Sequence, residues 1–168
     1  YSAGGAVGAL SWGLRSATAY AQIRPALGGG KLDKLPLHTD QLLKVTVTYR
    51  VFLQIFFSNV LLMGASESGQ ASKRDQVRLR LLTPALKAFV ATRASESYLT
   101  LIESFGGQGY MEEVGMAEML RDCTVERIWE GTPAILSLDV LRVLVQSKGQ
   151  ALVELFQDIG AILASLPA

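Results

Sequence analysis

Apolar residues recur at helical spacing along most of the chain, and glycines or prolines separate the segments in which they do so. In residues 3–23, apolar side chains recur every three or four positions among many small residues, which predicts a tightly packed helix. This helix is expected to end at Pro25 and the glycines after it, because proline disfavours helical geometry in the residue before it.

Residues 40–66 contain a strand-like alternation of valines with Thr46, Thr48 and Arg50, but the whole segment favours a helix. The stretch that lacks glycine and proline is much longer than an ordinary strand. One apolar stripe at helical spacing also runs through it, formed by Leu42, Val45, Tyr49, Phe52, Phe56 and Val60.

A third helix is predicted to begin at Ser72, which stands with Asp75 at the spacing of a capping box, and Pro84 is expected to kink or restart it. The stripe expected to face inward is Leu79, Leu82, Leu86, Phe89, Val90, Tyr98, Leu101 and Ile102. The charged residues expected on its outer face are Arg78, Arg80, Lys87, Arg93 and Glu96. With Arg74, the basic ones form a stripe that a solvated face explains better than a binding surface.

Further helical segments are predicted at 114–121, 132–146 and 151–164. The pattern therefore predicts an all-α protein, a four-helix bundle with short extra helices. We expect the bundle domain to span residues 1–147 and a C-terminal tail helix to lie within 148–168.

Composition and charge narrow the classes of function. The chain has 16 Lys+Arg and 15 Asp+Glu, so nucleic-acid binding is not expected. We expect no metal site, because the single Cys123 and the single His38 do not stand at ligand spacing. The uncharged run 51–66 is short and partly polar, so no membrane span is expected. We expect an intracellular protein, for which bacterial cytoplasm, mitochondrial matrix and peroxisome fit equally.

The stretch RIWEGTPAILSLDVLRVLV, residues 127–145, places a carboxylate directly before a helix start. Thr132 is expected to accept a hydrogen bond from a first-turn N–H, and Pro133 suits the first helical position. The free N–H groups of such a start favour an anion, and Glu130 beside Trp129 is placed to act as a base. The alternative interpretation is an exposed glutamate before an ordinary helix cap.

The stretch FGGQGY, residues 105–110, allows a close approach of backbone to a partner. That partner is either a phosphate chain or another helix, and the residues alone slightly favour a packing turn. No strand precedes the glycines, which excludes the Rossmann fingerprint.

Four stretches in order, YAQIRPALGG, ESFGGQGYMEE, LRDCTVERIWEGT and the helix after it, resemble the C-terminal helical domain of the acyl-CoA dehydrogenase family. The resemblance runs from residue 1 to about 147, and its details look closest to the branch that contains AidB and related eukaryotic dehydrogenases. It implies an FAD-dependent enzyme that desaturates acyl-CoA thioesters between the α and β carbons.

The resemblance also implies roles for individual residues. Glu130 matches the base that removes the α-proton, and Thr132 matches a threonine that contacts FAD near it. Arg24 matches an arginine that reaches the FAD of a neighbouring subunit. Glu103, Gly106 and Gly107 match the segment that lines the adenosine and pyrophosphate of that same cofactor. A site shared between subunits implies a homo-oligomer, in this family usually a tetramer built as a dimer of dimers.

This sequence also departs from the family pattern. Ala26 and Leu27 stand where a polar residue and an aromatic are usual, so fewer cofactor contacts are expected there. The family's N-terminal helical domain and middle β-domain have no counterpart in these residues, nor does the first half of the opening helix. We therefore expect this polypeptide alone not to be a competent dehydrogenase.

Two other functions stay open at this stage. One is an AidB-like flavoprotein with a DNA-binding, alkylation-response role and weak dehydrogenation, although the near-neutral charge argues against it. The other is an assembly module without flavin. Neither the acyl chain nor the electron acceptor is predicted, because the residues that select them lie outside this segment.

Overall fold

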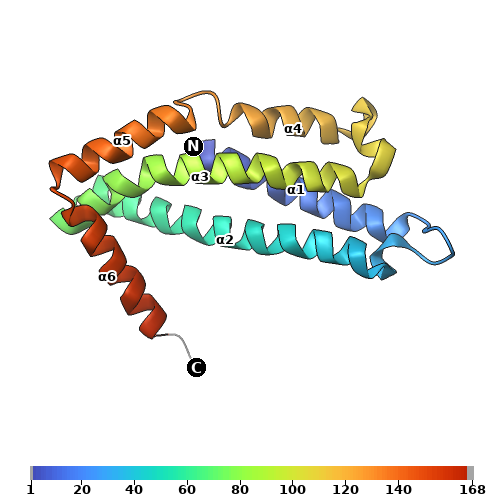
Figure 1. The fold of residues 1–168 in the computed structure, drawn as a ribbon, viewed down its shortest axis with the longest axis horizontal. Helices are drawn as coiled ribbons and strands as arrows, with labels where there is room; N and C mark the ends of the chain where they lie inside the picture. Colours follow the sequence, from blue (N-terminus) through green and yellow to red (C-terminus); the bar gives the residue numbers. More distant parts are fainter. Residues whose placement is uncertain (1, 166–168) are drawn as a thin grey trace.

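The computed structural model describes residues 2–165, which form six α-helices and three short 3-10 helices (Figure 1). Within that range no strand is formed, and one isolated bridge pairs Pro25 with Lys31 across the glycine loop. The all-α prediction is therefore confirmed. The elements are α1 (Ser2–Ile23), η1 (Leu32–Lys34), α2 (Pro36–Glu67), α3 (Lys73–Ser104), η2 (Gly106–Tyr110), η3 (Glu112–Val114), α4 (Met116–Val125), α5 (Pro133–Gln146) and α6 (Gln150–Ala164).

The bundle is built on three long helices, with two shorter ones at the fourth position. Helices α1 and α3 run in one direction and α2 runs in the other, while α4 and α5 follow one another back along α3 (Figure 1). A turn at residues 126–132 separates α4 from α5 and lies near the start of α1. The fourth position is thus interrupted about halfway along the bundle, and the interruption holds the candidate base.

Small residues allow α1 to pack closely against α3. A Cβ placed on Gly13 would come within 2.7 Å of the Tyr98 ring and 2.9 Å of Leu101, so only glycine fits there without a shift. Tyr98, Leu10 and Leu101 are among the largest fully buried side chains. The tight packing expected of residues 3–23 is present in the structure.

The segment with alternating valines and threonines lies in helix α2 and is not a strand. The hydroxyls of Thr46 and Thr48 donate to the carbonyls of the residues four positions earlier, at 2.7 and 3.0 Å, as helical geometry permits. The inner face buries Leu42, Val45 and Phe52, as the stripe predicted.

The outer face of α2 is apolar as well. An 18-residue window of this helix has a mean hydropathy of 1.5 and only 11% of it is buried within the chain, so α2 meets the length and composition criteria for a membrane span. A helix that packs in a globular protein meets the same criteria, and α2 packs on α1 and α3. The absence of a membrane span therefore stays a prediction.

Helix α3 begins with the predicted capping box, in which the Ser72 hydroxyl accepts from the Asp75 N–H and the Asp75 carboxylate accepts from the Ser72 N–H. It continues through Pro84 to Ser104 as one helix and does not restart there. Part of the expected inward stripe was wrong: Phe89 is 53% exposed, while Leu81 is buried. The reason is that α5 and α6 cover an additional side of the N-terminal half of α3.

The solvated-face prediction for the basic stripe on α3 holds for Arg74, Arg80 and Arg93, which are exposed, and is wrong for Lys87. Arg80 donates two hydrogen bonds to the Asp139 carboxylate of α5, both at 2.6 Å. Arg74 and Arg78 lie 2.5 and 3.4 Å from the Asp158 carboxylate of α6. Lys87, expected to face outward, is only 8% exposed. Three of these basic residues, Arg74, Arg78 and Arg80, therefore also link the last two helices to the bundle.

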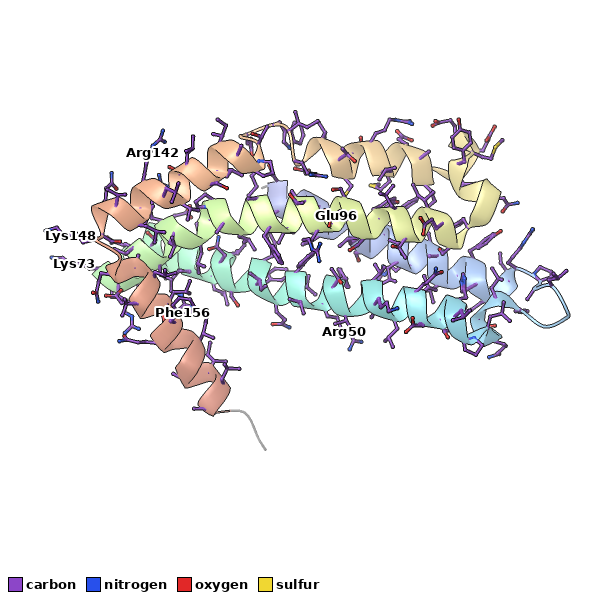
Figure 2. All side chains as sticks on the ribbon, in the orientation of Figure 1. Arg50, Lys73, Glu96, Arg142, Lys148 and Phe156 are labelled. Atoms are coloured by element: carbon purple, nitrogen blue, oxygen red, sulfur yellow. The ribbon has the colours of Figure 1, made fainter. Side chains whose placement is uncertain are left out.

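Helix α6 departs from the bundle axis at the end where α3 begins (Figure 1). Beside the Asp158 ion pairs, it is held by a small apolar cluster of Ala151 with Leu81 and Val143. Most of its remaining surface is exposed, including Phe156, which Figure 2 labels on the projecting part. The same figure shows Arg50 on α2 and Arg142 on α5 pointing away from the bundle. The division at residue 147 stays a prediction.

Candidate functional site

The turn between α4 and α5 presents Glu130 in an unusual backbone conformation. Glu130 has φ +51° and Gly131 has φ +98°, so two consecutive residues are left-handed. Such a conformation costs energy in a residue with a Cβ and is often found at functional sites. The Trp129 indole N–H donates to the Glu126 carboxylate at 2.8 Å, which fixes the start of the turn. The Glu130 carboxylate is therefore presented by a strained backbone turn.

The Glu130 carboxylate is exposed, and it has one partner on α1. The Ser2 hydroxyl donates to Glu130 Oε2 at 2.6 Å, although the two residues are far apart in the sequence. Beside the carboxylate lies a groove of about 270 Å³ bounded by α2, α3 and α5, with Phe56, Lys87 and Leu136 among its lining residues. Glu130 thus stands at the rim of a hollow with mainly apolar walls.

Helix α5 begins at the predicted residue, but its N-cap lacks the predicted side-chain hydrogen bond. Pro133 occupies the first helical position and Thr132 is the extended N-cap residue, as expected. The Thr132 side chain makes no capping hydrogen bond, so the expected bond to a first-turn N–H was wrong. The hydroxyl of Thr132 and the first-turn N–H groups of α5 therefore remain available to a polar ligand next to Glu130.

Lys87 is a contributor to this site that the sequence pattern did not reveal. Its ammonium donates to the carbonyl oxygens of Trp129 and Gly131, both at 2.5 Å. Burial lowers the pKa of the Lys87 ammonium, and the carboxylates of Glu130 and Glu126 oppose that shift. The available signal was that Lys87 stands at helical spacing from Ala91, Ala94 and Tyr98, which are buried on the same face of α3.

The other predicted cofactor residues gather at the far end of the bundle. Arg24, Glu103, Gly106 and Gly107 all line one hollow of about 670 Å³ between the end of α1 and the end of α3. Tyr20 and Phe105 hold these two ends together, with stacked rings whose centroids are 4.5 Å apart. The structure therefore brings together four of the six predicted site residues.

The glycines of residues 105–110 divide between two roles. A Cβ on Gly109 would clash with the carbonyl oxygen of Ile102, so this glycine is required for packing. Gly106 has φ +61°, and a Cβ on Gly106 or Gly107 would meet nothing within 4 Å. These two glycines therefore present open backbone to the hollow. The packing interpretation is confirmed at Gly109, and a phosphate partner at Gly106 and Gly107 stays a prediction.

The hollow at Arg24 fits an anionic, polar ligand. It combines an exposed guanidinium with uncovered backbone at Gly106 and Gly107, which suits a phosphate group, and the Glu103 carboxylate can accept hydrogen bonds from hydroxyls. His38, in the first turn of α2, lines the same hollow. Its Nε2 is buried and has no hydrogen-bond partner among the described residues.

Glu130 and Arg24 belong to two separate sites. Ser2, at the start of α1, contacts Glu130, whereas Arg24 directly follows the last residue of the same helix. At a rise of 1.5 Å per residue, the 22 residues of α1 separate the two ends by about 33 Å. The start of α1 therefore lies beside Glu130, about halfway along the bundle, and the other end of α1 lies beside the hollow at Arg24.

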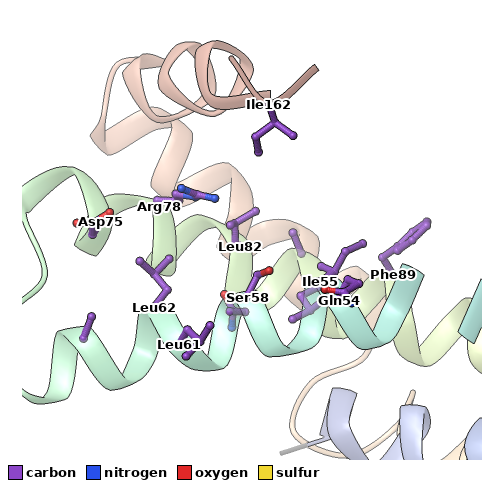
Figure 3. Close-up of a pocket in the computed structure, with 14 residues that line it drawn as sticks. Gln54, Ile55, Ser58, Leu61, Leu62, Asp75, Arg78, Leu82, Phe89 and Ile162 are labelled. Carbon is purple, nitrogen blue, oxygen red and sulfur yellow. The ribbon is translucent and has the colours of Figure 1, made fainter. Parts of the chain in front are cut away.

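A third, larger hollow has no such chemistry. It measures about 920 Å³ and lies between α2 and α3, with Ile162 of α6 across from Ile55, Leu61 and Leu82 (Figure 3). Its walls are mainly apolar, and none of the predicted site residues lines it.

Comparison with known proteins identifies the family. Residues 2–145 match the family described as "Acyl-CoA dehydrogenase, C-terminal domain". The chain therefore belongs to the acyl-CoA dehydrogenase family, and its fold is that of the C-terminal helical domain.

Individual relatives agree with this assignment. Acyl-CoA dehydrogenase family member 11 of Caenorhabditis elegans is 46% identical over 115 residues, which cover 68% of this chain and 19% of that protein. Putative acyl-CoA dehydrogenase AidB of Escherichia coli K12 is 38% identical over 80 residues, 48% of this chain and 15% of that protein. A crystal structure of C. elegans ACDH-11 in complex with C11-CoA superposes with a TM-score of 0.92 at 37% identity, covering 97% of this chain and 27% of that one. The matched part of the chain spans only 15 to 27% of the length of these relatives.

Proposed function

We propose that this domain supplies the catalytic base of an FAD-dependent acyl-CoA dehydrogenase, which desaturates acyl-CoA thioesters between the α and β carbons. The observation that carries the proposal is the Glu130 carboxylate, held on a left-handed residue at the start of α5 and hydrogen-bonded to Ser2. The family assignment and the acyl-CoA complex of the C. elegans relative support it.

The step assigned to this chain is a proton transfer. The α carbon–hydrogen bond breaks, the proton passes to the Glu130 carboxylate, and its electron pair forms the carbon–carbon double bond as a hydride leaves the β carbon. Bound FAD supplies the chemistry of accepting that hydride. A base fixed at a helix start is held within reach of the proton more reliably than one on a free loop. Thr132 and the first-turn N–H groups of α5 would hold the polar edge of the cofactor beside it.

The second site supports the shared-cofactor arrangement that the family resemblance implies. Arg24, Glu103, Gly106 and Gly107 form an anion cradle about 33 Å from Glu130, the length of α1. We infer that this cradle takes the adenosine and pyrophosphate end of the FAD of a neighbouring copy. The proposal therefore includes a homo-oligomer, a tetramer built as a dimer of dimers, and an inactive domain when it is expressed alone.

The arginines of α3 do not favour the DNA-binding alternative. Three of the arginines on α3 pair with carboxylates of α5 and α6, which offset the positive charge of this face. The relative AidB also aligns over a shorter stretch and at lower identity than family member 11.

The experiment is a Glu130→Gln substitution in the complete protein that contains this domain, with flavin content measured in parallel. Turnover of an acyl-CoA substrate is expected to fall by roughly 100- to 10,000-fold with flavin retained, because the amide cannot take the proton. Unchanged turnover at full flavin content would exclude the role of Glu130.

A further inference from the structure

Lys87 reaches the backbone of the Glu130 turn from helix α3. Its side chain is 8% exposed, and its ammonium donates to the carbonyl on each side of Glu130, that of Trp129 and that of Gly131. It therefore spans the left-handed pair on the backbone side, while the carboxylate of Glu130 is left to the hydroxyl of Ser2.

Burying an ammonium in a helical bundle is unfavourable unless its protons are satisfied. Here two carbonyl acceptors satisfy two of the three, and the carboxylates of Glu130 and Glu126 are the charged groups that act on the ammonium. Removing the ammonium would leave both carbonyls without this donor next to an already strained residue. Lys87 therefore has a specific effect on the turn that an apolar residue of equal length lacks.

We propose that Lys87 is a positioning residue for the catalytic base: by binding the carbonyls of Trp129 and Gly131 it fixes the Glu130 turn in the conformation that aims the carboxylate. This inference rests on the proposed function, in which Glu130 takes the substrate proton. In this role Lys87 acts on Glu130 through the backbone of the turn. Small errors in the position of a base reduce the rate of the chemical step strongly, by roughly 100-fold for a displacement of about 1 Å.

The test compares Lys87→Met and Lys87→Arg in the complete protein. Methionine keeps the length and apolar stem without the donor, and arginine keeps a donor with a different shape. The matched control is Arg93→Met, which removes an exposed cation of the same helix whose partner is Glu96. Hydrogen exchange of residues 126–133 and the separate values of kcat and KM are measured for each variant.

The expected result for Lys87→Met has three parts. Exchange quickens in residues 126–133 and not in the rest of α3, kcat falls roughly tenfold to 100-fold, and KM and flavin content stay near those of the wild type. Lys87→Arg recovers part of kcat, and Arg93→Met changes none of these quantities.

Other outcomes overturn the inference. An unchanged kcat, or faster exchange throughout the bundle with parallel loss of flavin, assigns Lys87 a general structural role or none. If Lys87→Met does not fold, Lys87→Leu, which also lacks the donor, takes its place, and an unchanged kcat in that variant has the same meaning. Full activity of Glu130→Gln would remove the proposed function and this inference together, whereas an inactive Glu130→Gln beside a fully active Lys87→Met would remove this inference alone.

Discussion

At the scale of single residues, burial decides which polar groups are chemically active. Glu130 is exposed on a strained turn, whereas Cys123 is packed in the core beside α1 and α3. Burial raises the pKa of the Cys123 thiol to about 12, and the Glu126 carboxylate acts in the same direction. Cys123 therefore packs as a small apolar side chain and contributes no nucleophile.

We predict that Cys123 resists alkylation in the native protein. At pH 8 iodoacetamide is expected to label it at least roughly 100-fold more slowly in the native state than in denaturant, because the thiolate is scarce and enclosed. Peptide mass spectrometry that follows the Cys123 peptide measures this difference. Equal rates in both states would contradict the burial described here.

The same shift has a consequence for stability. The pKa of the folded thiol lies above its ordinary value of 9.0, so the folded state holds the proton more tightly. This contribution to stability is fully present below pH 9 and is lost as the pH rises towards 12. A Cys123→Ala variant is expected to lose less stability than the wild type over that range, as thermal unfolding at several pH values would show.

At the scale of elements, close helix packing depends on particular glycines. Gly13 faces Tyr98 and Leu101, whereas a Cβ on Gly8 of the same helix would meet nothing within 4 Å. We expect Gly13→Ala to destabilise the domain by about 1–3 kcal/mol through overpacking. Gly8→Ala is expected to be neutral or to stabilise it by up to about 1 kcal/mol through helix propensity. Thermal unfolding distinguishes the two variants. Equal changes in Tm would show that Gly13 is not needed for the close packing of α1 on α3.

Helix α6 depends more on ion pairs than the other helices do. Asp158 accepts from Arg74 and lies near Arg78, and the apolar cluster beneath α6 is small. We expect Asp158→Asn, or high salt, to quicken hydrogen exchange in residues 150–164 while leaving α3 unchanged. Asp40→Asn, which removes an ion pair within α2, serves as the control. If neither Asp158→Asn nor high salt changes hydrogen exchange in residues 150–164, another contact holds α6.

Several elements could be predicted from the sequence because their local signals agree. The capping box at Ser72, the proline at the start of α5 and the length of α2 each indicated the helix that formed. The inward set on α3 was partly wrong, because periodicity gives a stripe but does not say how many neighbours cover the helix. Lys87 was missed for a related reason, since a lysine is expected outside unless the acceptors that satisfy it are known.

At the scale of the whole molecule, the domain presents two sites at the two ends of α1. The site residues were predicted from four sequence motifs, and the structure separates them into a base with its helix start and a distant anion cradle. Sequence order alone did not show this separation. Glu103 stands at the end of α3, and α4 then runs back along the bundle before the chain reaches Glu130 (Figure 1). The arrangement is understandable if each copy contributes one end to its own active site and the other to a neighbour.

The central claim is that Glu130 takes a proton from an acyl-CoA as flavin is reduced. The most direct measurement mixes the complete protein anaerobically with short- to long-chain acyl-CoA thioesters and follows flavin absorbance, with Glu130→Gln in parallel. We predict rapid bleaching by one class of chain length in the wild type and none on that timescale in Glu130→Gln. A bound flavin that no thioester reduces, or equal bleaching of both proteins, would contradict the account.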